Sequence, residues 1–225
     1  MTIKIGINGF GRMGRLAMRA AFNWDDIEIV QINDPAGNAE TLAHLLNFDS
    51  IHGRWEHQAE HLCDKMIIAD RFIPCTRNTA ITDTDWSQCD VVLEASGKMK
   101  TSTLLQGYLD QGVKRVVVTA PVKEEGVLNV VMGVNDDLYN KDLHPIVTAA
   151  SCTTNCLAPV VNVLKEKLGI NHGSITTTHK KTKTHTKHTK NKKTKNKQKP
   201  KQTNKTTNNQ HQKKKHAKNT TKHTK

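Results

Sequence analysis

Residues 3–14 read Ile-Lys-Ile-Gly-Ile-Asn-Gly-Phe-Gly-Arg-Met-Gly, and the last six contain a spaced glycine pattern, Gly9, Gly11 and Gly14. The pattern follows an apolar stretch at residues 2–8 that is typical of a buried strand, and it precedes a run with helical spacing. Glycines at this spacing let the backbone approach a pyrophosphate at the positive end of a helix. Asp34 lies twenty residues beyond the last glycine, where its carboxylate can accept hydrogen bonds from the adenosine ribose. The pattern therefore predicts dinucleotide binding rather than a purely structural turn, and Asp34 favours NAD because it would repel a 2′-phosphate.

Apolar runs and helical segments alternate along the rest of the first 170 residues. Strands are expected at residues 27–32, 66–69, 71–74, 90–94, 115–118 and 146–150, and helices at 15–22, 39–48, 101–110 and 152–168. Most of these strands are continuous apolar runs, which is typical of strands buried on both faces. The alternation predicts an α/β fold with a doubly wound parallel sheet, the Rossmann architecture.

Charge divides the chain into two unlike parts. The 225 residues contain 34 Lys and Arg against 21 Asp and Glu, a net charge of +13, yet all the acidic residues precede residue 176. Residues 176–225 contain 18 Lys and no large apolar side chain. Such a segment cannot offset its ordering entropy, so we expect a disordered basic tail after one globular domain.

Other classes of protein are excluded by simple features. The first residues lack a basic segment followed by an uninterrupted apolar one, so no secretory signal is expected. The chargeless run 143–164 contains prolines and asparagines and favours a soluble strand and helix, so no membrane partner is expected. Five cysteines, an odd number, indicate a reducing compartment, and we expect the cytoplasm.

A second motif lies at residues 150–156, which read Ala-Ser-Cys-Thr-Thr-Asn-Cys. Cys152 falls in the first turn of the expected helix, where the helix dipole favours the nucleophilic thiolate, although a small core residue would also fit there. Cys152 and Cys156 share one helical face, as a metal pair or a disulfide would require. No second pair follows at zinc-site spacing, so no metal is expected, and Cys156 is expected to be buried one turn further on.

The segments 6–15, 33–34, 49–54 and 150–155 together resemble glyceraldehyde-3-phosphate dehydrogenase. They read Gly-Ile-Asn-Gly-Phe-Gly-Arg-Met-Gly-Arg, Asn-Asp, Asp-Ser-Ile-His-Gly-Arg and Ala-Ser-Cys-Thr-Thr-Asn. The Ser-Cys-Thr-Thr-Asn block is specific to that family and its erythrose-4-phosphate relatives.

The resemblance implies roles for individual residues. It makes Cys152 the catalytic nucleophile. It implies that NAD is held by the glycine turn, by the residues Arg12, Met13 and Asp34, by Ser96 and Gly97 on the nicotinamide side, and, more loosely, by Arg77 near the adenine. It also implies that Ser151 and Thr153 contact the substrate.

The family places its catalytic histidine after a strand ending in two threonines and an aliphatic residue. Residues 176–182 of this chain read Thr-Thr-Thr-His-Lys-Lys-Thr, so the resemblance assigns the general base to His179 and a substrate-phosphate contact to Thr182. Thr178 departs from the aliphatic residue. The alternative is that His179 is one more polar residue of the tail, which contains six histidines.

The resemblance implies three regions and an activity. Residues 1–151 are expected to form the NAD-binding Rossmann domain, 152–179 the start of a truncated α+β catalytic domain, and 180–225 a low-complexity Lys/Thr/His/Asn/Gln tail unlike the family. The implied reaction is the NAD-dependent, phosphorylating oxidation of glyceraldehyde 3-phosphate through a Cys152 thioester, by a homotetramer. Segments 33–35, 53–55, 119–122 and 133–136 resemble the branch associated with arsenic-efflux operons, in which arsenate replaces phosphate. We expect the 225-residue chain itself to be inactive.

The composition of the tail leaves three hypotheses. Forty-nine of its last fifty residues are Lys, Asn, Thr, His, Gln or Pro, the complete set encoded by codons that contain only A and C, and Ala217 is the exception. Selection on a charged, disordered segment would also admit Arg, Ser, Gly and Glu. The pattern favours an error in the nucleotide record over an inert tail. The alternative function is a catalytically dead Rossmann fragment whose polycationic arm binds nucleic acid in a salt-dependent way.

Overall fold

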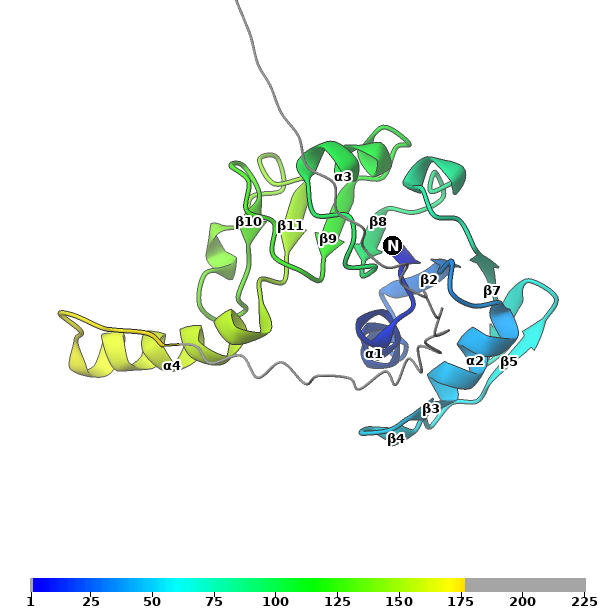
Figure 1. The fold of residues 1–225 in the computed structure, drawn as a ribbon, viewed down its shortest axis with the longest axis horizontal. Coiled ribbons are helices and arrows are strands. Elements are labelled where there is room, and N and C mark those ends of the chain that lie inside the picture. Colours follow the sequence, from blue (N-terminus) through cyan, green and yellow to red (C-terminus); the bar gives the residue numbers. More distant parts are fainter. Residues whose placement is uncertain (1, 177–225) are drawn as a thin grey trace, which may run out of the picture. The chain divides into compact units, whose positions relative to one another are not determined.

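A nine-stranded sheet organises the part of the chain that the structure, a computed structural model, describes, residues 2–176. Its strand order is β10-β11-β9-β8-β1-β2-β7-β6-β5 (Figure 1). The strands are Ile3–Asn8 (β1), Ile27–Asn33 (β2), Ala59–Leu62 (β5), Lys65–Ile68 (β6), Arg71–Thr76 (β7), Val91–Glu94 (β8), Arg115–Val118 (β9), Leu128–Asn129 (β10) and Ile146–Thr148 (β11). Phe48–Asp49 (β3) and Gly53–Arg54 (β4) form a separate antiparallel pair.

Helices connect these strands in the alternating order that the sequence predicts. They are Arg12–Ala21 (α1), Ala39–Asn47 (α2), Ser102–Leu109 (α3) and Cys152–Leu168 (α4), with 3₁₀ turns at Ile81–Asp83 (η1) and Asp136–Leu138 (η2). No helix within residues 2–176 combines the length and the apolar character that crossing a membrane requires.

The strands from β10 to β7 all pair in parallel, whereas β5, β6 and β7 form an antiparallel meander. β1 lies between β2 and β8, which are reached by connections on opposite sides of it in the strand order. This is the switch point of a doubly wound sheet, outside which ligands bind at the carboxyl ends of the strands. The predicted α/β Rossmann fold is confirmed.

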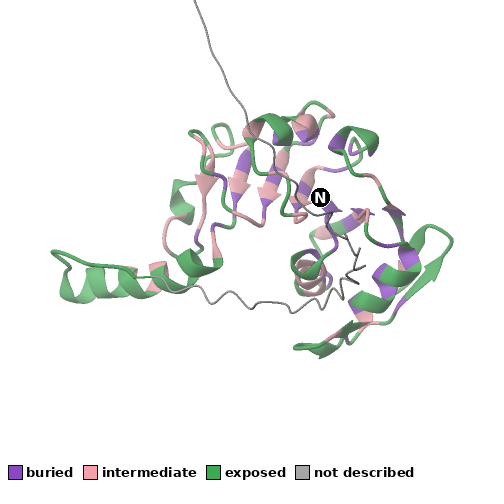
Figure 2. Ribbon diagram, viewed as in Figure 1, coloured by how far each residue is buried: buried purple, intermediate pink, exposed green. Residues whose placement is uncertain are grey.

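Two clusters of buried apolar side chains stabilise the sheet (Figure 2). The first includes Ile7, Ile32 and Met18 and joins β1 and β2 to α1, α2 and the meander. The second includes Trp86 and Val116 and joins β8 and β9 to α3 and η1. Both clusters include side chains of strands that end at the switch point, β1 and β2 in the first cluster and β8 in the second. Packed side chains therefore support the backbone there.

The described residues up to Ser174 form one compact unit. The predicted domain boundary between residues 151 and 152 stays a prediction. The expected tail at 180–225 lies outside the described residues.

Candidate functional site

The turn between β1 and α1 is packed so closely that two of its glycines have no room for a side chain. Gly9 has a φ of 92°, and a Cβ there would lie 2.3 Å from the backbone nitrogen of Ser96. A Cβ on Gly14 would lie 2.2 Å from the carbonyl oxygen of Gly9. A Cβ on Gly11 would meet nothing within 4 Å. The turn is therefore closed at Gly9 and Gly14 and open at Gly11, which is the geometry that admits a pyrophosphate to the backbone.

The first turn of α1 presents backbone donors to this opening. Gly11 is the N-cap and has no side chain to cap the helix, and the first turn contains no acidic residue. The first N–H groups of a helix have no intrahelical acceptor, and they lie at the positive end of its dipole. Arg12 and Met13 are the first two residues of α1, and both are exposed. Their backbone is thus placed to bind an anion such as a phosphate.

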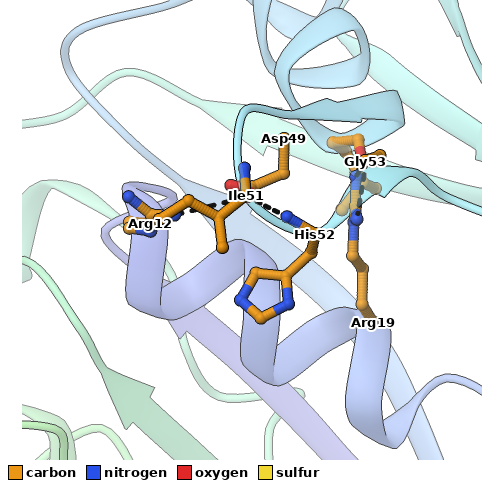
Figure 3. A network of polar contacts seen from close by, with 7 residues as sticks. Arg12, Arg19, Asp49, Ile51, His52 and Gly53 are labelled. Atoms are coloured by element: carbon orange, nitrogen blue, oxygen red, sulfur yellow. Dashed lines mark hydrogen bonds and ion pairs between the residues drawn. The ribbon is translucent and has the colours of Figure 1, made fainter.

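Figure 3 shows how the segment after α2 is attached to α1. Arg12 forms an ion pair with Asp49 at 3.3 Å, and Asp49 accepts hydrogen bonds from the N–H groups of Ile51 and His52 at 2.9 and 2.8 Å. These two backbone donors, with a contribution from Arg12, hold the pKa of Asp49 below its ordinary value. Arg19 donates to the carbonyl oxygen of Gly53 at 3.3 Å. The two arginines therefore hold the β3–β4 segment against the helix that begins at the glycine turn.

Asp34 follows the last residue of β2 and is half-buried. One carboxylate oxygen accepts the N–H of Phe10 at 2.7 Å, and the other accepts the N–H of Ala36 at 2.8 Å. Asp34 therefore stabilises the glycine turn itself. Each carboxylate oxygen has a second lone-pair direction, so the same side chain can accept hydrogen bonds from ribose hydroxyls.

These elements border one cavity of about 200 Å³ at the carboxyl edge of the sheet. Its lining combines four residues that the sequence singled out with eight that it did not. The lining residues are Asn8, Gly9, Gly11, Asp34, Pro35, Ala36, Asn78, Thr79, Ala95, Ser96, Lys98 and Met99. The open glycine, the free helix donors and the carboxylate together fit a dinucleotide with its pyrophosphate at α1 and one ribose at Asp34.

The nucleophile candidate, Cys152, is the first residue of α4 and is exposed. The helix begins there because the Ser151 side chain accepts the N–H of Thr154 at 3.1 Å. Ala150, just before the cap, has a φ of 54°, a left-handed conformation that L-residues rarely adopt. Its N–H donates to the hydroxyl of Thr148 at 3.0 Å, which holds this bend at the end of β11.

Strand order places Cys152 on one particular side of the cavity. β11 is separated from β8 by β9 alone, and all three strands are parallel. Parallel strands are about 4.8 Å apart, so the carboxyl ends of β11 and β8 are separated by about 10 Å along the sheet edge. Cys152 therefore follows the strand on the Ser96 side of the switch point, opposite Asp34.

Comparison with known proteins agrees with this geometry. Residues 3–102 match the family described as glyceraldehyde 3-phosphate dehydrogenase, NAD binding domain, and residues 151–221 match the C-terminal domain of the same enzyme. Glyceraldehyde-3-phosphate dehydrogenase 3 of Nostoc sp. is 52% identical over 188 residues, which cover 83% of this chain and 56% of that protein. Glyceraldehyde-3-phosphate dehydrogenase 2 of Bacillus subtilis is 42% identical over 181 residues, which cover 80% and 53%.

The chain belongs to the glyceraldehyde-3-phosphate dehydrogenase family. It spans about half the length of the curated relatives that it matches. Residues 3–102 are the NAD-binding domain of this family, and NAD is its cofactor. The match to the C-terminal domain runs to residue 221, beyond residue 179, where the sequence motifs predict the resemblance to end. Neither match supports the alternative of a nucleic-acid-binding module.

Within this family assignment, the structure brings some of the predicted NAD-binding residues to the cavity and leaves others beside it. Gly9, Gly11, Asp34 and Ser96 line it. Gly14 lies behind the turn, while Arg12 and Met13 begin α1. Gly97 follows Ser96 with a φ of 70°, and Arg77 is an exposed neighbour of the lining residue Asn78. The predicted roles of all these residues stay predictions.

The prediction for Cys156 is wrong. Its side chain is exposed, because no residue of α4 is buried among residues 2–176. Ser151 and Thr153 lie at the start of α4, where their hydroxyl oxygens are 3.0 Å apart. His179 and Thr182 lie outside the described residues. Within residues 2–176 no group of three His, Cys, Asp or Glu side chains is placed to hold a metal.

The residues that sequence reasoning missed are mostly polar side chains at strand ends. Asn8, Asn33 and Glu94 are the last residues of β1, β2 and β8, and all three are at least 95% buried. Asn33 donates to the side chain of Asn8 at 2.8 Å and accepts the N–H of Asn78 at 2.8 Å. A polar residue at the end of an apolar strand was the available signal, since a buried polar group requires a partner.

Proposed function

We propose that this protein is a phosphorylating glyceraldehyde-3-phosphate dehydrogenase, with Cys152 as its nucleophile and NAD as its oxidant. The observation that carries the proposal is the position of Cys152. It starts α4 after a strand that lies beyond β8 from the glycine turn, so the thiol is on the side of the cavity away from Asp34. A nucleophile on that side would lie toward the half of the dinucleotide that accepts hydride.

The residues present fit the cofactor in three places. The backbone of Gly11, Arg12 and Met13 would hold the pyrophosphate, and Asp34 would bind the adenosine ribose. Ser96 and Gly97 would border the nicotinamide. NAD, when bound, supplies the hydride acceptor for the oxidation.

The proposed chemistry forms and breaks bonds at the sulfur of Cys152. The thiolate adds to the aldehyde carbon of the substrate and gives a hemithioacetal. Loss of a hydride from that carbon and of the hydroxyl proton leaves a thioester. Attack by inorganic phosphate on the thioester carbon releases an acyl phosphate and regenerates the thiolate. The backbone N–H of Cys152 has no intrahelical acceptor, and it is proposed to donate to the oxyanion in the tetrahedral steps.

Further roles are proposed on the family resemblance alone. His179 would accept the proton as general base, and Ser151, Thr153 and Thr182 would contact the substrate and its phosphate. Arsenate in place of phosphate as the attacking anion is the finer proposal, and it rests on the resemblance to the arsenic-operon branch. We also propose a homo-oligomeric enzyme that works in the cytoplasm.

The test is an assay of the protein purified from its native source and of two matched variants, Cys152→Ser and Cys156→Ser. With NAD, glyceraldehyde 3-phosphate and phosphate, we expect NADH formation in the wild type and in Cys156→Ser but none in Cys152→Ser. Mass spectrometry without phosphate should find the acyl group on the peptide that contains Cys152. Turnover that survives in Cys152→Ser, or an acyl group elsewhere, would refute the assignment.

Two added measurements address the finer proposals. Replacing phosphate by arsenate tests whether the same enzyme uses that anion. If NADH formation with arsenate is no faster than with neither anion, the arsenate proposal alone is refuted. The intact mass of the native protein tests the hypothesis that residues after 179 reflect a sequence error, since a mass equal to that of the 225-residue chain would refute it.

A further inference from the structure

Glu94 is a deeply buried acidic side chain at the edge of the cavity, with 1% of its surface exposed. It ends β8, and the loop that follows it, residues 95–99, supplies Ala95, Ser96, Lys98 and Met99 to the cavity lining. The side chain itself is not part of the lining. Any influence of Glu94 on a bound dinucleotide must therefore act through the residues that it holds.

Four donors converge on the two oxygens of Glu94. One oxygen accepts the N–H and the hydroxyl of Ser96, at 2.8 and 2.5 Å. The other accepts the amide of Asn8 at 2.8 Å and the hydroxyl of Tyr108 at 2.6 Å. Each oxygen of Glu94 is thus approached by two donors, so both oxygens act as hydrogen-bond acceptors.

The state of Tyr108 agrees with this assignment. Burial raises the pKa of Tyr108, and the charge of Glu94 and the hydrogen bond to it raise the pKa further, so the phenol stays protonated and donates. Within residues 2–176 no Lys, Arg or His side chain forms an ion pair with Glu94. The four hydrogen bonds therefore compensate for the burial of Glu94, and removing its carboxyl group would leave these donors without that acceptor.

The hydrogen bonds of Glu94 connect the two backbone segments that meet at the switch point. Asn8 precedes Gly9 at the glycine turn, and Ser96 begins the turn after β8. The two segments touch, since a Cβ on Gly9 would lie 2.3 Å from the nitrogen of Ser96. The hydroxyl of Ser96 also accepts the N–H of Lys98 at 3.2 Å, so Glu94 orients the whole turn through one serine.

We propose that Glu94 is a positioning residue that fixes loop 95–99 for the nicotinamide half of NAD. The assignment to that half follows from the fold. Asp34 lies on the β2 side of β1 and serves the adenosine ribose, whereas loop 95–99 lies on the β8 side, where the second mononucleotide half of a Rossmann domain binds its ligand. The inference rests on the NAD binding of the proposed function and adds a residue that does not contact the ligand.

The test compares NAD⁺ with ADP-ribose, which lacks the nicotinamide, in calorimetric titrations of the 225-residue chain. The main variant is Glu94→Met, which keeps the length of the side chain and removes every acceptor. The control is Tyr108→Phe, which removes a donor to the oxygen that faces away from Ser96. All titrations are made well below the melting temperature of the least stable variant, so that both variants can lose stability without unfolding.

We expect Glu94→Met to weaken NAD⁺ binding about tenfold, the effect of losing hydrogen bonds to a charged group, and to change ADP-ribose binding less than about twofold. Tyr108→Phe should leave both affinities within about twofold of the wild type. Glu94→Gln should recover most of the NAD⁺ affinity, because its amide oxygen can still accept from Ser96. Glu94→Asp keeps the charge but has a shorter reach, and it should show a smaller selective loss, which preserves the test if Glu94→Met does not fold.

Three results would overturn the inference: unchanged NAD⁺ affinity in Glu94→Met and Glu94→Asp, equal loss of NAD⁺ and ADP-ribose, or a loss in Tyr108→Phe as large as that in Glu94→Met. A wild-type chain that binds ADP-ribose but not NAD⁺ would also overturn it. A wild-type chain that binds neither ligand would instead refute the cofactor assignment of the proposed function, so the two failures are distinguishable.

Discussion

Substituting alanine at two glycines of the same turn should separate folding from binding. At Gly14 the added Cβ would lie 2.2 Å from the carbonyl oxygen of Gly9, whereas at Gly11 it would meet nothing within 4 Å. Gly14 is buried in α1 and Gly11 is exposed. The same chemical change thus meets a backbone atom at one position and open space at the other.

The magnitudes favour a net destabilisation at Gly14. Alanine is better than glycine in a helix by about 1 kcal/mol, which would stabilise the variant. Overpacking costs about 1–3 kcal/mol, and the upper end applies here because the obstacle is backbone that cannot rotate away. The net loss is then about 2 kcal/mol, or about 4–8 °C in melting temperature for a folded unit of this size. Gly11→Ala should lower the free energy of unfolding by less, about 0.5–1 kcal/mol, because alanine is a poorer N-cap than glycine.

The effects of the two substitutions on NAD⁺ affinity should differ from their effects on stability. Gly11→Ala places a methyl group where the pyrophosphate approaches, so we expect NAD⁺ affinity to fall at least about tenfold with a smaller fall in melting temperature than in Gly14→Ala. Gly14→Ala should lower both quantities, because moving α1 also moves its free N–H groups. Differential scanning calorimetry and NAD⁺ titration measure the two effects. A Gly14→Ala chain as stable as the wild type, or a Gly11→Ala chain with full affinity, would refute the reasoning.

Three further expectations follow from contacts away from the cavity. Arg19→Lys replaces a guanidinium that donates to two backbone carbonyl oxygens, so the free energy of unfolding from urea titration should fall by about 1–2 kcal/mol; an unchanged midpoint would contradict this. The hydrogen bond from Lys114, with that from the Lys4 N–H, lowers the pKa of Asp90 from 3.8, so its stabilisation is present above pH 3.8 and lost as the pH falls through the folded-state pKa. Thermal melts of Asp90→Asn and the wild type should therefore differ at pH 7 and converge at lower pH, and a constant difference would count against the ion pair. Burial raises the pKa of Cys75 to about 11 and that of Cys89 to about 12, so iodoacetamide should label the native chain only at its exposed thiols, Cys63, Cys152 and Cys156. Mass spectrometry should find two more labels in denaturant, and labelling of either buried thiol in the native chain would contradict the packing.

The parts of the site that sequence predicts are those with local geometry. The roles of Gly9 and Gly14 depend on atoms within a few residues or on the adjoining strand, so spacing alone indicates them. Asp34 is predictable for a similar reason, since the length of one strand–helix–strand unit places it beside the turn. The start of α4 at Cys152 follows from a local cap, Ser151.

What sequence does not predict depends on partners that are far apart in the chain. Glu94 and Asn8 are separated by 86 residues, and Asn8 and Tyr108 by 100. No periodicity links such positions, because they meet only when the order of the strands is known. The left-handed backbone of Ala150 is equally hidden, since residue type favours glycine or asparagine there. The burial of Cys156 was mispredicted because helical spacing identifies a face but not whether another element covers it.

Four of the buried polar residues nevertheless share one position in the fold, the last residue of a parallel strand. Asn8, Asn33, Glu94 and Thr148 each end a parallel strand, and each is at least 95% buried. At that position the chain leaves the ladder, so the N–H groups of the following loop lose their strand partners and need other acceptors. Three of these four side chains supply them: Glu94 accepts from Ser96, Asn33 from Asn78, and Thr148 from Ala150, whereas Asn8 bonds to the side chains of Asn33, Glu94 and Tyr108.

This arrangement explains why the cavity lies at the carboxyl edge and why its loops can be held without being part of the sheet. An apolar residue at the end of each strand would satisfy the core but leave the loop donors without acceptors, at a cost of about 1–3 kcal/mol for each one that is buried. A polar residue there satisfies the loop donors while its side chain stays buried. The side chains that shape the cofactor site are therefore the last ones of the strands, and a run of apolar residues that ends in Asn, Glu or Thr is the sequence signal to search for.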